Sequence, residues 1–275
     1  MKAYDILFGH EQDALSISTH PAGTRAPVPD AFRAGWIGTR GPRLGTAWPR
    51  GALTRLPMMH VLTLELPAEY QRRGAVLPAV SFFAGEGDAA RPLAPETDLD
   101  DPFFTDLTTA TKNPNEQQYT DEMGFSWALV WLTPEQLASG PGEVPADPRR
   151  PGQHVADDDG PNAWDQDHPT VPAWLVDRKD PNAGRAPVDD APADGDPVTG
   201  YLPPYGDDDD HGLRDWARPF ADPCTCHLGG TAMPVQELPE GLTPYYLELE
   251  ELPGVNIGGG NCQIDLESGV FDWAC

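Results

Sequence analysis

Lysine and cysteine are both scarce in this chain, and long apolar runs are absent. All four cysteines follow residue 223, a placement that does not fit the disulfide framework of a small secreted scaffold. The first ten residues contain no apolar core of signal-peptide length. No run of about eighteen apolar residues occurs that could cross a bilayer. We therefore expect a cytoplasmic protein.

Positive charge is also in short supply. Acidic residues number 44 against 18 basic ones, which gives a formal net charge of −26. Such a field repels phosphate backbones and anionic lipid headgroups, so we expect neither nucleic acid nor a membrane surface as a partner. It attracts a basic protein partner or metal cations. A surface that is acidic only for solubility accounts for the same composition.

The 32 prolines and 28 glycines predict many turns and few long helices. Thr133 followed by Pro134 is typical of a helix start, with threonine as the N-cap and proline at the first helical position. Three apolar, β-favouring runs are predicted as strands: Met58–Leu66, Ala75–Phe83 and Phe125–Leu132. Pro78 should split or end the second of these runs.

The composition divides the chain into three zones of one domain, 1–275. A β-rich N-terminal half (1–140) and a β-rich C-terminal half (213–275) flank an acidic zone (141–212), in which residues 141–210 hold seventeen acidic residues, five basic ones and thirteen prolines. We predict that Val171–Val176 docks as a short segment and that the rest of this zone is a surface insertion outside the core. The fold class is then α+β and predominantly β, with two halves around one core.

Two segments of the outer zones resemble each other. Pro57–Pro67 and Pro244–Pro253 are both β-favouring, bounded by proline and nearly equal in length. Each is followed by a glycine and then by another candidate strand. An internal duplication is therefore a hypothesis.

The cysteines supply the strongest chemical signal. Cys224, Cys226 and His227 lie within four residues, and Cys262 and Cys275 could provide further ligands from a second element. Thiolates and imidazoles are the ligands that zinc prefers, which makes these five residues a candidate zinc site. The usual zinc knuckle has at least two residues between its cysteines, so an ordinary turn and a core cysteine remain the alternative interpretation.

Other motifs predict less chemistry. None of the aspartate clusters has the spacing of a twelve-residue calcium loop, and we do not expect a calcium site; these clusters are 98–101, 157–160, 165–168, 194–196 and 207–211. Ser126 follows Gly124-Phe but lies at the start of a predicted strand rather than in a nucleophile elbow. His60 lies within a predicted strand and is interpreted as a structural residue. No catalytic residue is assigned.

The order of short motifs near the C-terminus is similar to a known pattern. Cys224-Thr-Cys-His-Leu-Gly-Gly, then Pro244-Tyr-Tyr-Leu-Glu-Leu-Glu, Gly258-Gly-Gly260 and a closing Asp272-Trp resemble the C-terminal half of the YwqG-like proteins, a bacterial domain family of unknown function. Trp48-Pro49 and the strand ending in Phe83 resemble its N-terminal half more loosely. In that family the glycine turn typically reads Gly-Asp-x-Gly, and this chain lacks the aspartate.

Two functions follow as hypotheses. The first is a non-catalytic, acidic protein-binding module; members of the resembled family sometimes lie near bacterial toxin loci, which implies an immunity or accessory protein that blocks a basic toxin. The second is a metal-dependent enzyme or a zinc-stabilised domain centred on the Cys/His cluster.

Overall fold

The computed structural model describes residues 1–10, 30–87, 90, 100–121, 123–153, 160–206, 212–220 and 226–275. Eleven strands in these ranges form one sheet, and all neighbouring strands are antiparallel. They are β1 (Ala3–Phe8), β2 (Phe32–Ile37), β3 (Met59–Glu65), β4 (Ala79–Ala84), β5 (Glu116–Thr120), β6 (Ser126–Leu132), β7 (Val171–Arg178), β8 (His227–Leu228), β9 (Tyr246–Glu250), β10 (Asn261–Asp265) and β11 (Phe271–Ala274).

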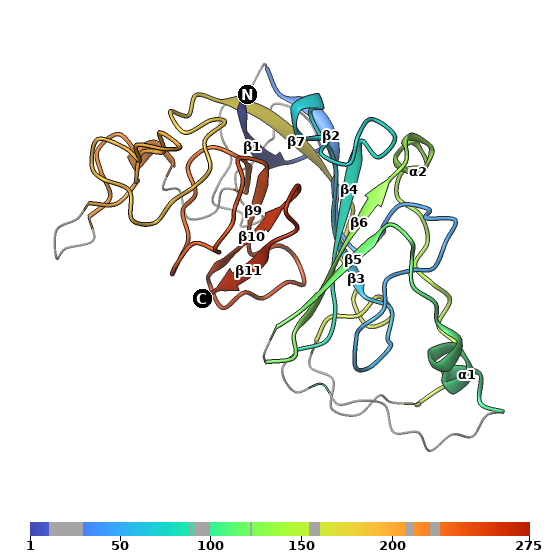
Figure 1. Cartoon of the computed structure of the whole chain (residues 1–275). Helices are drawn as coiled ribbons and strands as arrows, with labels where there is room; N and C mark the ends of the chain where they lie inside the picture. Colours follow the sequence, from blue (N-terminus) through green and yellow to red (C-terminus); the bar gives the residue numbers. More distant parts are fainter. Residues whose placement is uncertain are drawn as a thin grey trace.

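The sheet is nearly closed on itself. Its strand order is β11-β10-β9-β8-β1-β7-β2-β3-β4-β6-β5. Figure 1 shows the sheet bent so that the red C-terminal strands face the green strands β5 and β6. The largest hydrophobic core cluster lies between them and takes side chains from both ends of the order, including Trp127 and Leu129 of β6 and Leu249 of β9. The protein is therefore predominantly β and has one main core.

Helices are few and short, as the proline and glycine content predicts. Within the described ranges they are α1 (Pro102–Thr109), α2 (Pro134–Ala138) and the short 3-10 helices η2 (Ala68–Tyr70) and η3 (Arg218–Phe220). The predicted start of α2 is confirmed: Gln136 N–H donates to Thr133 Oγ1, and the Gln136 side chain accepts from Thr133 N–H. This reciprocal pair satisfies donors that the helix itself leaves open.

The predicted strands correspond to β3, β4 and β6, and β9 lies in the proline-bounded segment near the C-terminus. As its proline predicts, the second run is split, and β4 begins only after Pro78. His60 is buried on β3, where its ring nitrogens lie 2.5 Å from Gly38 O and 2.8 Å from Thr63 Oγ1. Burial lowers its pKa to about 4, so the ring is neutral at neutral pH. The structural interpretation of His60 is confirmed.

The prediction for zone 141–212 is wrong at Val171–Val176, which forms a central strand rather than a short docked segment. β7 lies in the middle of the sheet, between β1 and β2. Its Ala173 and Leu175 are fully buried in the main core. The reason is local: Val171–Val176 is an apolar run long enough for a strand, although the residues around it are acidic. Pro172 fits because the β1 ladder ends at the pair Phe8–Ala173.

Alternation along the strands separates two faces of the sheet. On the C-terminal strands the core face carries Leu247 and Leu249, whereas Tyr246, Glu248 and the equally buried Gln263 lie on the outer face. The loops that follow β7 and β8 cover this outer face, on the left of Figure 1. Polar groups buried there need partners from the loops, and this requirement positions the site described below.

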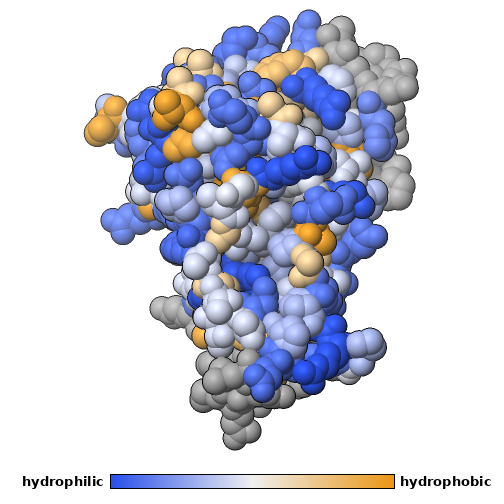
Figure 2. All heavy atoms as spheres, turned by 90° about the vertical axis from the view of Figure 1, so that its right-hand side faces the viewer, coloured by the Kyte–Doolittle hydropathy of each residue, from blue (hydrophilic) through white to orange (hydrophobic). Residues whose placement is uncertain are grey.

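The surface on the right-hand side of Figure 1, over β5 and β6, is mainly hydrophilic (Figure 2). Figure 2 shows hydrophobic side chains in small scattered groups on the face that turns the right-hand side of Figure 1 toward the viewer. Among the described residues, no helix has the length and apolar character to cross a membrane.

Candidate functional site

The structure brings two of the candidate zinc ligands, Cys226 and Cys262, into one core cluster, where burial and then the neighbouring Cys226 raise the pKa of Cys262, but it does not bring all the described candidates together. Cys226 and Cys262 are both buried in the main hydrophobic core. His227 follows Cys226 in the chain, and its side chain therefore points to the opposite, outer face of the sheet. Cys275 is exposed at the end of the chain. Cys224 lies outside the described residues.

No group of three or more His, Cys, Asp or Glu side chains within the described ranges could hold a metal ion. The aspartate cluster 207–211 and most of 157–160 also lie outside those ranges. Asp165, from a third acidic stretch, is bound by the guanidinium of Arg149 at 2.7 Å.

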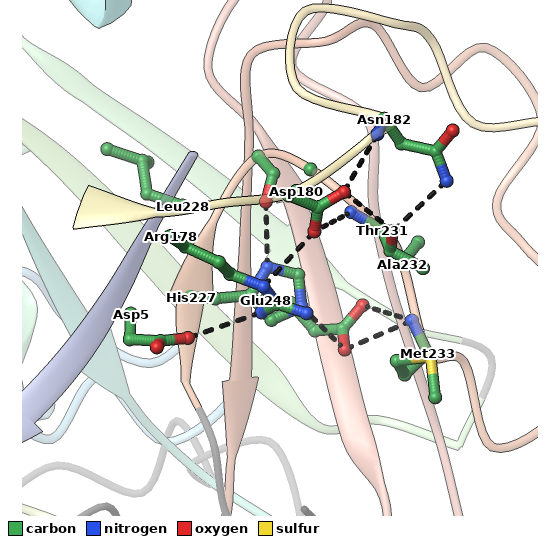
Figure 3. Close-up of polar contacts among 12 residues, drawn as sticks. Asp5, Arg178, Asp180, Asn182, His227, Leu228, Thr231, Ala232, Met233 and Glu248 are labelled. Atoms are coloured by element: carbon green, nitrogen blue, oxygen red, sulfur yellow. Dashed lines mark hydrogen bonds and ion pairs between the residues drawn. The ribbon is translucent and has the colours of Figure 1, made fainter. Parts of the chain in front are cut away.

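On the outer face, His227 forms a buried ion pair with Glu248 (Figure 3). Nε2 of His227 lies 3.0 Å from Glu248 Oε1, and both side chains are at most 2% exposed. Nδ1 of the same ring lies 3.0 Å from the carbonyl oxygen of Gly229. Both ring nitrogens therefore lie next to oxygen atoms, one from β9 and one from the backbone after β8, which holds the ring between the two strands.

Glu248 also accepts hydrogen bonds from the backbone and from the neighbouring strand. Its carboxylate receives Met233 N–H at 3.1 Å and Gln263 Nε2 at 3.1 Å. Burial alone would raise its pKa, but the charge of His227 and these hydrogen bonds outweigh burial and lower the pKa below the ordinary value of 4.5. Glu248 is therefore a buried carboxylate that stays ionised.

A second ion pair lies beside the first, at the end of β7 (Figure 3). Nε of Arg178 lies 3.1 Å from Asp180 Oδ2, and Nη1 lies 3.5 Å from Asp5 Oδ1. Asp180 also accepts from Asn182 N–H and from both the N–H and the hydroxyl of Thr231, each at 2.8 Å. These contacts fasten the loop after β8 to the end of β7.

The chemistry open to this buried cluster is limited. Protein donors already occupy the carboxylates of Asp180 and Glu248, and the side chains have almost no exposed area. Ser126 begins β6 and is 1% exposed, as its interpretation as a sheet residue predicts. The arrangement is suited to holding loops on the sheet rather than to proton transfer with a substrate.

Two exposed carboxylates, those of Asp189 and Asp190, line a cleft next to this cluster. We call it the acidic cleft: a hollow of about 330 Å³ whose lining includes no basic side chain among the described residues. Its walls are formed by segment 188–192, segment 201–206 and the loop after β8. The lining combines two carboxylates with aromatic and apolar side chains, among them Asp189, Asp190, Tyr201, Pro204, Tyr205 and Leu238.

Like charges gather at the cleft. Burial raises the pKa of Asp189, hydrogen bonds from Leu238 N–H oppose that rise, and the charges of Asp190 and Glu237 add to it. Glu250 lies on β9, outside the lining of the cleft, and burial next to the charges of Glu248 and Glu251 raises its pKa to about 8, so it is mostly protonated at neutral pH. The described lining has no basic side chain to offset the repulsion between these carboxylates, so a bound cation would offset it instead.

Aromatic rings supply the apolar part of the cleft. Tyr201 is fully buried and its hydroxyl accepts from Ala232 N–H at 3.2 Å, which fixes the ring in the wall. Tyr205 is 37% exposed, and Glu248 and Glu250 are close enough to raise its pKa after burial, the largest cause. A rigid ring beside an exposed ring and carboxylates is a combination that binds guanidinium or ammonium groups.

Sequence reasoning identified His227 and the acidic zone, but neither the His227–Glu248 pair nor the cleft. Glu248 occupies an outward position within a predicted strand, where a solvated carboxylate is the ordinary expectation. A signal was present in Tyr201 and Tyr205, two aromatic residues on either side of Pro203 and Pro204 in a zone with few apolar anchors. Comparisons of the chain with protein-family models, with curated proteins and with solved structures find no match.

Proposed function

We propose that the protein is a non-catalytic binding module whose acidic cleft receives a basic side chain of a protein partner. The observation that carries the proposal is the acidic cleft itself, where Asp189 and Asp190 meet Tyr201 and Tyr205 with no basic side chain in the described lining. The partner's cation would replace repulsion between carboxylates with attraction. Arginine suits the cleft better than lysine, because its planar guanidinium stacks on aromatic rings.

The charge of the whole chain supports the same partner class. A net charge of −26 produces a field that accelerates the approach of a basic protein and weakens as salt is added. Long-range attraction alone would not select a site, and the cleft supplies the short-range contacts. Aromatic residues that can be covered on binding are common anchors of protein interfaces.

A binding experiment with a matched control separates the cleft from the general field. The probe is an acetylated peptide amide, Gly-Arg-Gly-Arg-Gly, titrated into the protein by calorimetry at low and physiological salt. Asp189→Asn/Asp190→Asn removes two charges at the cleft, and Glu65→Gln/Asp167→Asn removes two exposed charges elsewhere. The cleft variant should bind at least about tenfold more weakly, a loss of roughly 1.4 kcal/mol, and the control should lose far less.

An immunity or accessory role toward a basic bacterial toxin is one form of this function, and it rests on the resemblance to YwqG-like proteins. The test is to mix the purified protein with the product of a neighbouring gene. A complex at micromolar concentration supports the role, and its absence counts against it.

The zinc-stabilised alternative stays a prediction, since Cys224 lies outside the described residues. Elemental analysis of purified protein decides it: folded protein without metal removes the alternative. A melting temperature that falls on addition of a chelator would support it.

We also propose that the two halves arose by duplication with exchange of their first strands. The eight central strands lie in the order β10-β9-β8-β1-β7-β2-β3-β4. If β1 to β4 are matched with β7 to β10 in turn, replacing each strand by its match gives the same order in reverse. Each strand therefore has the same neighbours as its match. Related chains whose two halves align more closely in sequence would support this origin.

A further inference from the structure

A second hollow lies beside the buried ion pairs and has a different character. We call it the arginine pocket: it measures about 580 Å³, and its lining includes Asp5, Arg178, Lys179, Leu202, Trp216 and Phe220. Leu202 faces this pocket, whereas its chain neighbours Tyr201 and Pro203 line the acidic cleft. The volume falls in the range of about 300–1,000 Å³ that is typical of small-molecule sites.

The guanidinium of Arg178 is the unusual group in this pocket. Its side chain is 3% exposed, and its Nη2 has no hydrogen-bond partner within the part of the chain that the structure describes. Phe220 lies over it, with the ring centroid 4.5 Å from the guanidinium carbon. A buried, unpaired N–H of a charged group is costly, so a ligand that accepts from it would gain a strong hydrogen bond.

The remaining charges of the pocket nearly balance. Asp177 is bound by the ammonium of Lys2 at 2.6 Å, which leaves Lys179 as an exposed cation at the rim. Asp5 and Asp180 already share the guanidinium of Arg178. One added negative charge is attracted by Lys179 and by the open Nη2 of Arg178, whereas a second would mainly meet repulsion from the two aspartates.

We propose that the arginine pocket binds a small monocarboxylate with a flat apolar body. The carboxylate accepts from Arg178 Nη2 and is attracted by Lys179. The apolar body packs against Trp216 and Phe220, whose rings lie 6.3 Å apart, and the Phe220 ring moves off the guanidinium to admit the carboxylate. This inference does not depend on the acidic cleft or on a protein partner.

The test uses 3-phenylpropionate, its neutral analogue 3-phenylpropanol, and phenyl phosphate, each titrated into the full chain by calorimetry and ligand-observed NMR. The carboxylate should bind with a dissociation constant on the order of 1 mM or tighter, as expected for so small a ligand. The alcohol and the phosphate should each bind at least about tenfold more weakly. The Gly-Arg-Gly-Arg-Gly peptide should not compete, because it addresses the acidic cleft.

Variants locate the binding. Arg178→Lys keeps the charge but loses the planar fork, and it should weaken 3-phenylpropionate by about tenfold. Trp216 takes no part in the ion pairs, so Trp216→Ala tests the apolar wall even if Arg178→Lys fails to fold. This substitution should weaken binding of 3-phenylpropionate by about fivefold. Lys112→Met, an exposed lysine remote from the pocket lining, is the control and should change nothing. No binding at 10 mM (about tenfold above the expected constant), equal binding of the alcohol, tighter binding of the phosphate, or unchanged binding in Trp216→Ala would overturn the proposal.

Discussion

The ring of Tyr119 on β5 stacks on the ring of Phe271 on β11, with centroids 4.7 Å apart, although these strands are the two ends of the sheet order. Side chains supply further contacts across the same gap: Gln117 Nε2 donates to Gly269 O at 3.0 Å, and Trp273 Nε1 donates to Asp121 Oδ2 at 2.7 Å. The sheet is therefore closed by side chains where ladder hydrogen bonds end.

Phe271→Ala should weaken this closure. The substitution removes ring contacts with Tyr119, Phe82 and Trp127 and should lower the free energy of unfolding by about 2–3 kcal/mol, below the range for a fully buried phenylalanine because Phe271 is only partly buried. Urea unfolding measures it. Phe32→Ala, at a phenylalanine that is 46% exposed, is the control. Equal losses in both variants would show that the closure carries no special stability.

His227→Phe should be strongly destabilising, because it leaves the Glu248 carboxylate buried without its cation. The expected loss in unfolding free energy is about 3–5 kcal/mol. The double variant His227→Phe/Glu248→Leu removes both charges and should lose much less than the sum of the two single variants. Additive losses in a double-mutant cycle by urea unfolding would contradict a coupled ion pair.

The same pair predicts a change of stability with pH. The pKa of Glu248 is lowered in the folded state, so its contribution is complete above the ordinary value of 4.5 and is lost as pH falls through the folded-state value. Acid unfolding monitored by circular dichroism should show this loss in the wild type. The double variant, which has no carboxylate at position 248, should show a shallower acid dependence.

Glu250 should act in the opposite sense. Its folded-state pKa of about 8 lies above the ordinary 4.5, so the stability that it contributes is full below pH 4.5 and is lost as pH rises toward 8. Glu250→Gln removes this loss, and the variant should melt at a higher temperature than the wild type at pH 8.5 but at nearly the same temperature at pH 4.5. Glu65→Gln controls for the removal of a surface carboxylate. A wild type that melts higher than Glu250→Gln at pH 8.5 would contradict this assignment.

The fold was predictable where periodicity and turn chemistry agreed. Met58–Leu66 and Phe125–Leu132 are apolar runs bounded by proline, glycine or a helix cap, and each became a buried strand. The apolar run Val171–Val176 was expected to dock, but not to form the strand β7, because aspartates and prolines surround it and the zone as a whole has the composition of a surface insertion. The central position of β7 depends on pairing with β1 and β2, which are more than 130 residues away in the chain.

The candidate site was less predictable for a physical reason. Sequence proximity joined Cys226 to His227, but the alternation of a strand sends their side chains to opposite faces. The partner that His227 does meet, Glu248, comes from the next strand in the sheet, and no local spacing encodes that register. The acidic cleft likewise combines three segments that meet only in the folded chain.

Peptide binding by the cleft variant tests the central claim most directly. The quantity is the ratio of dissociation constants for the arginine peptide between Asp189→Asn/Asp190→Asn and the charge-matched Glu65→Gln/Asp167→Asn, measured at physiological salt. A cleft that receives a basic side chain predicts a ratio of about five or more, since short-range contacts with the aspartates are lost in one variant only. A ratio near one would mean that the negative field attracts cations without a site, and it would contradict the proposed function.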